Sequence, residues 1–403
     1  MLKKSILFFF LCIQVCAWSQ TCILATDTVP MSQDALLLQR KMEYYRLNNN
    51  ISDRSTILIP VVIHVVWNEN DENISEKQIK SQLEILNACF SDARDANLVP
   101  AAFKDNIGKP NIQFCLAQKD PKGKPTTGIT RTETNISGIA SSVAVYYGAK
   151  GGANAWDTKQ YLNIWVAAFT DNSIGKSAYP GTVPLERDGI VVSPRHFGNI
   201  GTAADTDGHD LGLTAVHELG HYFNLIHIWG EKICDQSDCA DTDEVNDTPN
   251  QSTCQFGCPD LSFDDCDGTA MGMNYMDYVN DECKTMFTAG QVARMRASIF
   301  VARSSLLYSD ACNAPSIATL DNSERLVVNK VDAKGDVVFS IITAQPESIV
   351  WQFIDLQGKI IQSDIGNSNA PLIVNIETLP NGVYILGAKI NRQWIYKKVF
   401  ILK

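Results

Sequence analysis

The sequence has too few basic residues for a typical nucleic-acid-binding protein. Its 403 residues include 34 Lys and Arg against 45 Asp and Glu, which gives a formal net charge of −11. Binding to phosphates depends on clustered basic side chains, and this chain lacks such clusters. We therefore expect no nucleic acid among its partners. Acidic residues cluster instead in 235–267, which indicates cation binding.

Long apolar runs are also missing. No stretch approaches the roughly 18 consecutive apolar residues needed to cross a bilayer, so we expect no membrane span. Residues 1–19 have the pattern of an export signal, with two lysines, an apolar run over 6–15 and small residues suited to cleavage. Cys16 and Cys22 leave a lipoprotein as an alternative, although neither follows the small residues expected of a lipidation site.

Cysteine is absent from the last ninety residues, and half of the twelve cysteines fall within 234–283. Disulfides are the default in an exported chain, so this segment is expected to be rich in loops and held by up to three bridges. The alternative is a thiolate zinc site that uses Cys254 and Cys258.

Histidine is scarce, and three of the six histidines stand in one motif, HELGHYFNLIH, over 217–227. Residues four apart on a helix share a face, so His217 and His221 can bind one ion. Glu218 lies beside them, where its carboxylate can take a proton from a metal-activated water and deliver it to a leaving amine. The alternative is a helix whose His–Glu–His residues face solvent or are only structural.

The position of His227 tests the metal-site interpretation. Ten residues of unbroken helix would carry it about 15 Å beyond His217, whereas a Zn–N bond is about 2.1 Å long. The helix must therefore end and the chain must fold back. Asn224 permits this because Asn, after Gly, is the commonest residue in the left-handed conformation that ends helices. Three histidines would leave one coordination position for water.

Hydrophobic patterning predicts an α/β domain followed by a small β-sandwich. Residues 20–53 are polar, with a helical stretch at 32–47, and have the character of a prosegment and linker rather than core. Residues 54–312 are expected to form a catalytic domain, and 313–403 a separate all-β sandwich. The strands expected in the catalytic domain are 57–67, 111–117, 161–169 and 189–192, and the helices are 73–90, 211–225 and 291–307.

The motif resembles that of the metzincin zinc peptidases, and more closely that of their pappalysin group. Metzincins carry His-Glu-x-x-His-x-x-Gly-x-x-His and a downstream Met-turn, and NYMDY at 274–278 is similar to that turn. Asn224 stands where the family usually has Gly. The resemblance covers 55–312 and implies an α/β (α+β) metzincin-like fold, with a twisted sheet and an active-site helix. It also implies a secreted zinc-dependent endopeptidase that acts on proteins or peptides.

The same resemblance implies roles for residues beyond the histidines. Met276 would form an apolar base beneath the zinc ligands. The Tyr278 hydroxyl would stabilise the oxyanion or swing towards the metal, with simple packing as its alternative. Asp281 would lie at the bottom of the pocket for the residue after the scissile bond, where it would select Arg or Lys. A surface acid or turn former is the alternative for Asp281.

Pappalysin relatives also bind calcium near this pocket. Asp243, Asp247 and Thr248 are the residues that match best, and their oxygen ligands suit calcium. A solvated acidic loop is the alternative.

The resemblance also suggests a latent precursor. Cleavage between Asp53 and Arg54 would suit an enzyme that recognises Arg after the scissile bond, so we expect self-processing there. Cys22 could ligate zinc through its thiolate and maintain latency, with a disulfide as the alternative. Removal of the prosegment leaves nine cysteines, an odd number.

The last domain resembles the C-terminal sorting domain of the type IX secretion route of Gram-negative bacteria. The motifs that carry this resemblance are IDLQGK at 354–359, LPNGVYI at 379–385 and KKVFILK at 397–403. They imply a secretion-machinery partner and a location outside the cell or at its outer surface. A carbohydrate-binding or adhesive sandwich is the alternative, and the competing class for the whole chain is an adhesin without turnover. Glu218 and Tyr278 argue against an adhesin, because zinc binding alone needs neither.

Overall fold

The computed structural model divides the chain into two compact units, 1–315 and 316–403. The predicted signal, 1–19, and the predicted cleavage site, Asp53 and Arg54, lie outside the described residues. The structure describes residues 21–24 and 325–331 (both backbone only), 32–48, 56–204, 208–232, 234, 238–260, 263–266, 268–313, 336–342, 348–356, 358–368, 370–390 and 393–401.

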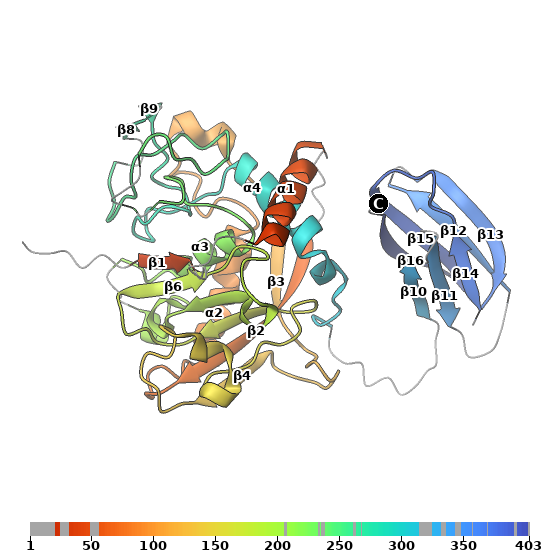
Figure 1. Cartoon of the computed structure of the whole chain (residues 1–403), viewed down its shortest axis with the longest axis horizontal. Coiled ribbons are helices and arrows are strands. Elements are labelled where there is room, and N and C mark those ends of the chain that lie inside the picture. Colours follow the sequence, from red (N-terminus) through yellow and green to blue (C-terminus); the bar gives the residue numbers. More distant parts are fainter. Residues whose placement is uncertain are drawn as a thin grey trace, which may run out of the picture. The chain divides into compact units, whose positions relative to one another are not determined.

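The first unit is built on a sheet whose described strands number seven (Figure 1). The strands are β1 (Thr21–Leu24), β2 (Ile57–Trp67), β3 (Ile112–Leu116), β4 (Ile129–Glu133), β5 (Leu162–Val166), β6 (Ser173–Ser177) and β7 (Gly189–Val192). Their order is β1-β6-β7-β5-β2-β3, and β4 continues the edge of β2 beyond β3. Neighbours run parallel except β6, which is antiparallel to β7.

Strand β2 is apolar on both faces, as its nearly continuous hydrophobic run predicts. Val61, Ile63 and Val65 face a core shared with the helices, whereas Val66 packs with Trp165 on the opposite side. Complete burial of such a side chain contributes roughly 1.5–3 kcal/mol, so β2 holds together both layers that cover the sheet. The prediction of an α/β domain around this strand is confirmed.

Four α-helices complete the described part of this unit: α1 (Gln33–Asn48), α2 (Glu76–Cys89), α3 (Leu213–Tyr222) and α4 (Ala289–Ala302). Ser75 caps α2, and Thr288 and Gln291 form a capping box on α4. Helix α4 stops at Ala302, and a separate 3-10 turn covers Ser304–Tyr308, where the sequence predicted one continuous helix.

Helix α1 forms where the sequence predicts a helix, but the expectation that it lies outside the core is wrong. It packs along α4 (Figure 1), and its Ala35 and Met42 are buried. Ala35, Leu38 and Met42 follow the spacing of one helical face. Leu36 and Tyr44 lie on the exposed side, so the apolar stripe is not evident from the sequence.

The cysteine-rich segment is held by three disulfides, as predicted: Cys234–Cys254, Cys239–Cys266 and Cys258–Cys283. The alternative of a thiolate zinc site is wrong, because Cys254 and Cys258 each pair with another cysteine. A fourth bridge joins Cys115 to Cys312. Among the described side chains, the unpaired cysteine is Cys89, which is buried in α2 and accounts for the odd number.

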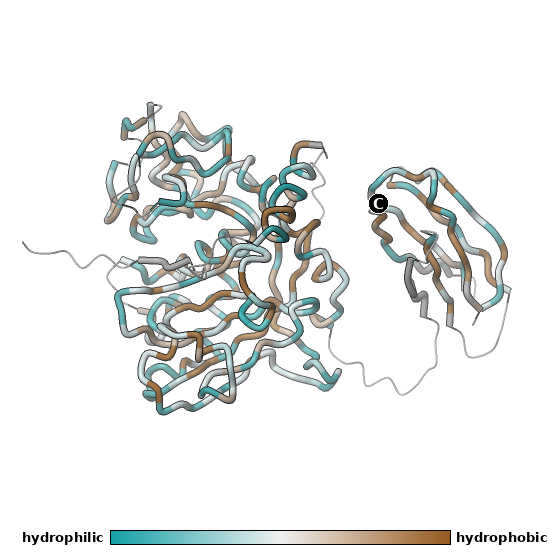
Figure 2. The backbone as a smooth tube through the Cα atoms, viewed as in Figure 1, coloured by the Kyte–Doolittle hydropathy of each residue, from teal (hydrophilic) through white to brown (hydrophobic). Residues whose placement is uncertain are grey.

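The second unit is a β-sandwich, as predicted. Where the chain is described, one sheet contains β10 (Arg325–Val331), β11 (Val337–Ile342) and β14 (Pro371–Val374). The other contains β12 (Ser348–Asp355), β13 (Ile360–Asn367), β15 (Gly382–Ile390) and β16 (Gln393–Ile401). Burial alternates along β12, so Ile349, Trp351 and Phe353 fill the core. Hydrophobic segments lie along strands of both units (Figure 2). No described helix in either unit is long and apolar enough to cross a membrane.

Candidate active site

Three histidine side chains converge at the C-terminal half of α3. His221 Nε2 lies 3.1 Å from His217 Nε2 and 3.0 Å from His227 Nε2. His217 Nδ1 faces the carbonyl of Tyr275 at 2.8 Å, and His221 Nδ1 faces that of Leu225 at 2.8 Å. A nitrogen that faces a carbonyl carries the proton, so the Nε2 lone pairs of both rings point towards each other.

These buried lone pairs repel one another unless a cation lies between them. Burial, the largest cause, lowers the pKa of His221 to about 4. Burial, followed by the neighbouring histidines, holds the pKa of both His217 and His227 well below the ordinary value. The rings are therefore neutral, which is the form that binds metal. Three neutral imidazoles, two of them oriented by carbonyls, fit Zn²⁺ with one position left open.

Asn224 produces the turn that brings His227 back, as the sequence predicts. Its φ of 78° is left-handed, and two hydrogen bonds close the end of α3. Leu225 N donates to Gly220 O at 2.8 Å, and Asn224 N donates to His221 O at 2.8 Å. This is a Schellman motif with Asn at the left-handed position. The helix ends at Tyr222, three residues before the predicted end, because the turn begins there.

Met276 lies directly against the active-site helix. Its side chain is fully buried, and a Cβ added at Gly220 would lie 2.4 Å from Met276 Sδ. Asn274 Oδ1 accepts a hydrogen bond from Met276 N at 2.9 Å, which fixes the turn. The neighbouring Tyr275 supplies the carbonyl that orients His217. The Met-turn thus supports the metal site by packing and through its backbone.

Glu218 and Tyr278 line one pocket together with His217. A Cβ added at Gly175 of β6 would lie 2.4 Å from Glu218 Oε1, so only Gly leaves room for this carboxylate. The Tyr278 ring lies 5.6 Å from the His217 ring and 5.1 Å from the His227 ring. Tyr278 is therefore packed against the ligands and also lines the pocket.

Asp281 lies at the opposite end of α3, where it is fully buried, so the alternative of a surface acid is wrong. Its Oδ2 accepts hydrogen bonds from Leu211 N at 3.0 Å and Leu213 N at 3.1 Å. Burial works to raise the pKa of Asp281, but His209 and then Lys284 outweigh burial and hold that pKa below its usual value. An ionised carboxylate thus satisfies amides at the start of the active-site helix.

The structure brings only two of the three predicted calcium ligands together. The Thr248 hydroxyl donates to the Asp243 carboxylate at 2.8 Å, and both side chains are buried, so a solvated loop does not describe them. Asp247 turns towards the start of α4, where it accepts hydrogen bonds from Thr288 Oγ1 at 2.6 Å and Gly290 N at 2.8 Å. Burial raises the pKa of Asp243 to about 7.

Several residues that build the site were not found from the sequence. His209, Thr214 and Lys284 line the pocket beside Glu218, yet each is a single residue without a motif. Strand β6 was also missed. Its residues lack the apolar run typical of a strand, although its antiparallel pairing with β7 places Gly175 beside Glu218.

The fold and the site define a zinc metallopeptidase of the metzincin class, and comparisons with known proteins narrow this further. A family described as pregnancy-associated plasma protein-A matches residues 149–300, and the secretion system C-terminal sorting domain matches 323–402. A mutant of Tannerella forsythia promirolysin is 40% identical, with a TM-score of 0.61 over 68% of this chain and 91% of its own.

Two further proteins are similar to this chain. Mature mirolysin of Tannerella forsythia, solved with a cleaved peptide, is 42% identical, with a TM-score of 0.58 over 63% of this chain and 96% of its own. An extracellular metalloprotease of Arthroderma gypseum is 27% identical over 64% of this chain and 78% of its own. This chain belongs to the pappalysin family and is a secreted zinc metalloendopeptidase with a C-terminal sorting domain.

Proposed function

We propose that this protein hydrolyses peptide bonds with a zinc ion held by His217, His221 and His227. The observation that carries the proposal is the convergence of three neutral imidazole nitrogens beside Glu218. Zinc bound there supplies a Lewis acid and lowers the pKa of a bound water to about 7. Glu218 accepts a proton from the attacking water and returns it to the leaving amine. The Tyr278 hydroxyl donates a hydrogen bond to the developing oxyanion.

Arg or Lys after the scissile bond is the proposed preference, with Asp281 as the selecting charge. Its ionised state and its ion pair with His209, which lines the pocket, support this role. Lys284 argues against this role, because its basic side chain lines the pocket and Asp281 itself does not. The variant Asp281→Asn separates charge from structure, since an amide oxygen can still accept from Leu211 and Leu213.

Calcium is proposed to bind at the loop that contains Asp243, Asp247 and Thr248. The support is the pair of oxygen-bearing side chains, Asp243 and Thr248, buried in contact. Calcium would keep Asp243 ionised despite its burial and would stabilise a segment with little hydrophobic core.

We also propose a latent precursor that is processed between Asp53 and Arg54. The backbone of Cys22 in β1 lies opposite Gly175 of β6, the residue that adjoins Glu218. This register supports a role for Cys22 at the zinc ion, and β1 occupies the edge of β6. The C-terminal unit would engage the type IX secretion machinery and leave the enzyme outside a Gram-negative cell or on its surface.

Digestion of a denatured protein mixture, followed by sequencing of the new termini, tests this proposal. The processed protein with zinc and calcium is expected to produce new N-termini that begin with Arg or Lys. An absence of cleavage would refute the proposed hydrolysis. Cleavage without this preference would refute only the role of Asp281.

A further inference from the structure

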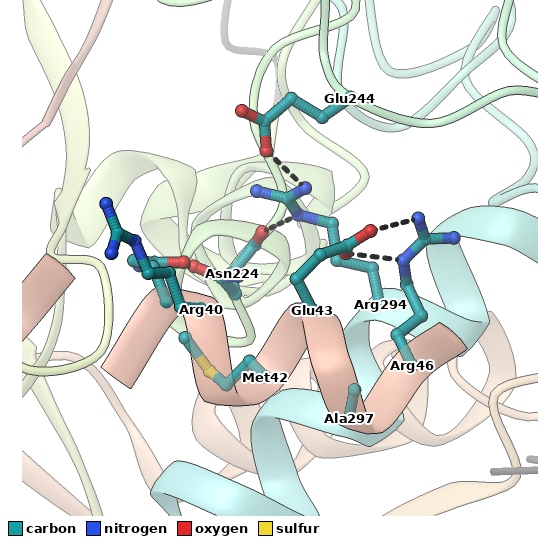
Figure 3. Close-up of a pocket in the computed structure, with 9 residues that line it drawn as sticks. Arg40, Met42, Glu43, Arg46, Asn224, Glu244, Arg294 and Ala297 are labelled. Atoms are coloured by element: carbon teal, nitrogen blue, oxygen red, sulfur yellow. Dashed lines mark hydrogen bonds and ion pairs between the residues drawn. The ribbon is translucent and has the colours of Figure 1, made fainter. Parts of the chain in front are cut away.

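The turn that presents the third histidine is in contact with the predicted prosegment. Gln39 Nε2 of α1 donates a hydrogen bond to Asn224 Oδ1 at 2.9 Å, across 185 residues of sequence. Asn224 is only 4% exposed, whereas Gln39 is half-buried, so this bond is partly shielded from water. Figure 3 shows α1 lying over Asn224 and Arg294, with Met42 and Glu43 on the facing side of the helix.

This contact gives a reason for Asn where the metzincin motif has Gly. Gly adopts a left-handed conformation at no steric cost, so the turn alone does not require Asn. Asn adds a side-chain amide, whose oxygen accepts a hydrogen bond from Gln39 of α1. A Gly at position 224 would close the same turn but would offer α1 no acceptor.

The contact also lies close to the metal site along the chain. Asn224 is the left-handed residue of the turn, and Leu225, which follows it, orients His221 through its carbonyl at 2.8 Å. His227 comes three residues after Asn224, so any shift of this turn moves the third ligand. A group that holds the Asn224 side chain therefore influences the orientation of His221 and the position of His227.

We propose that α1 braces this turn in the precursor and so strengthens zinc binding until the prosegment leaves. The inference rests on the proposed function, in which His227 binds zinc and residues up to 53 are removed. Because coupling between two sites is reciprocal, bound zinc also favours the docking of α1. The docking surface consists of the side of α4 along which α1 packs and the Asn224 side chain, and its partner is residues 33–48 of this chain.

The test uses the full-length precursor with Glu218→Ala, which prevents self-processing. Two rates are measured: transfer of zinc to a chelator, and hydrogen exchange of the α1 amides. Gln39→Ala is expected to raise both rates by about two- to tenfold, the effect of losing one partly buried hydrogen bond. Asn224→Gly should raise the hydrogen-exchange rate of the α1 amides by the same factor. The double variant that combines both substitutions should exchange no faster than either single variant.

The matched control is Lys41→Ala, at an exposed position of the same helix. Both alanine substitutions slightly favour a helix, so loss of helix propensity cannot explain a weakened α1. Unchanged zinc transfer in Gln39→Ala overturns the inference, as does an additive double variant. A precursor that binds no zinc refutes the proposed function instead, so the two failures are distinguishable.

Discussion

The backbone oxygen of Asn224 accepts a hydrogen bond from Arg294 Nε at 2.6 Å. A second arginine bonds two residues earlier in the chain, where Arg303 Nε donates to the Tyr222 carbonyl at 3.0 Å. Both carbonyls belong to the end of α3, where backbone oxygens lack partners within the helix and the helix dipole is negative. Two guanidinium groups from the α4 region therefore hold the end of the zinc-binding helix in place.

Replacement of Arg294 should weaken zinc binding. Arg294→Gln removes a charged hydrogen bond to Asn224, and we expect zinc affinity to fall roughly 10- to 100-fold, as for other groups that orient metal ligands. The control is Arg296→Gln, because Arg296 is a buried arginine of the same helix that bonds to the Pro110 carbonyl instead. Competition with a chelator measures the zinc affinity of both variants. Equal losses in the two variants would show that Arg294 contributes only to general stability.

Gly175 should be essential for activity although it carries no side chain. Gly175→Ala places a Cβ against the Glu218 carboxylate and must displace it. Displacement of a catalytic group by about 1 Å can lower kcat roughly 100-fold, so we expect that loss with zinc content retained. Gly148→Ala is the control, since its nearest neighbour would lie at an ordinary 3.6 Å. Full activity of Gly175→Ala would contradict the placement of Glu218.

Asp277 should make stability depend on pH. Burial raises its pKa from 3.8 to about 6, so between these values the folded chain binds more proton than the unfolded chain. The contribution of Asp277 to stability is therefore largest at low pH and falls as pH rises through this window, by about 3 kcal/mol in all. Asp277→Asn should not show this loss of stability, because its side chain does not titrate.

Urea unfolding of both proteins between pH 4 and pH 8 measures the difference. Relative to Asp277→Asn, the wild-type protein should lose stability up to about pH 6 and then show no further change. A difference that does not vary with pH would contradict the raised pKa.

Calcium removal should lower the thermal stability of the protein. A bound ion at 100 times its dissociation constant stabilises by about 2.7 kcal/mol, and that amount should disappear in a calcium chelator that leaves zinc in place. Asp243→Asn should abolish the response, whereas Asp264→Asn, at an exposed acid of the same segment, should retain it. A melting temperature that does not respond to calcium would exclude the site.

The sequence predicted those parts of the molecule whose physical causes are local. The apolar run of β2, the helical pattern of α2 and the left-handed Asn224 each depend on residues within a few positions. The motif spacing then required a turn, and the turn is present. Disulfide partners could not be assigned, because many pairings satisfy the same spacing.

The parts that were missed depend on long-range contacts. Strand β6 contains Lys176, which is buried because its ammonium donates to the Ala140 carbonyl and lies over the Tyr146 ring. No local pattern indicates such a lysine. Arg294 and Gln39 likewise act on Asn224 from 70 and 185 residues away, so only the folded chain reveals them.

The central claim is that three histidines bind zinc while Glu218 performs the proton transfer. The most direct test measures zinc content and peptide hydrolysis together in the processed protein and in processed Glu218→Gln, with the prosegment removed by another protease. We predict one zinc per chain in both proteins, and hydrolysis slower by roughly 10²- to 10⁴-fold in the variant. Hydrolysis at the normal rate by Glu218→Gln, with zinc bound, would contradict the account.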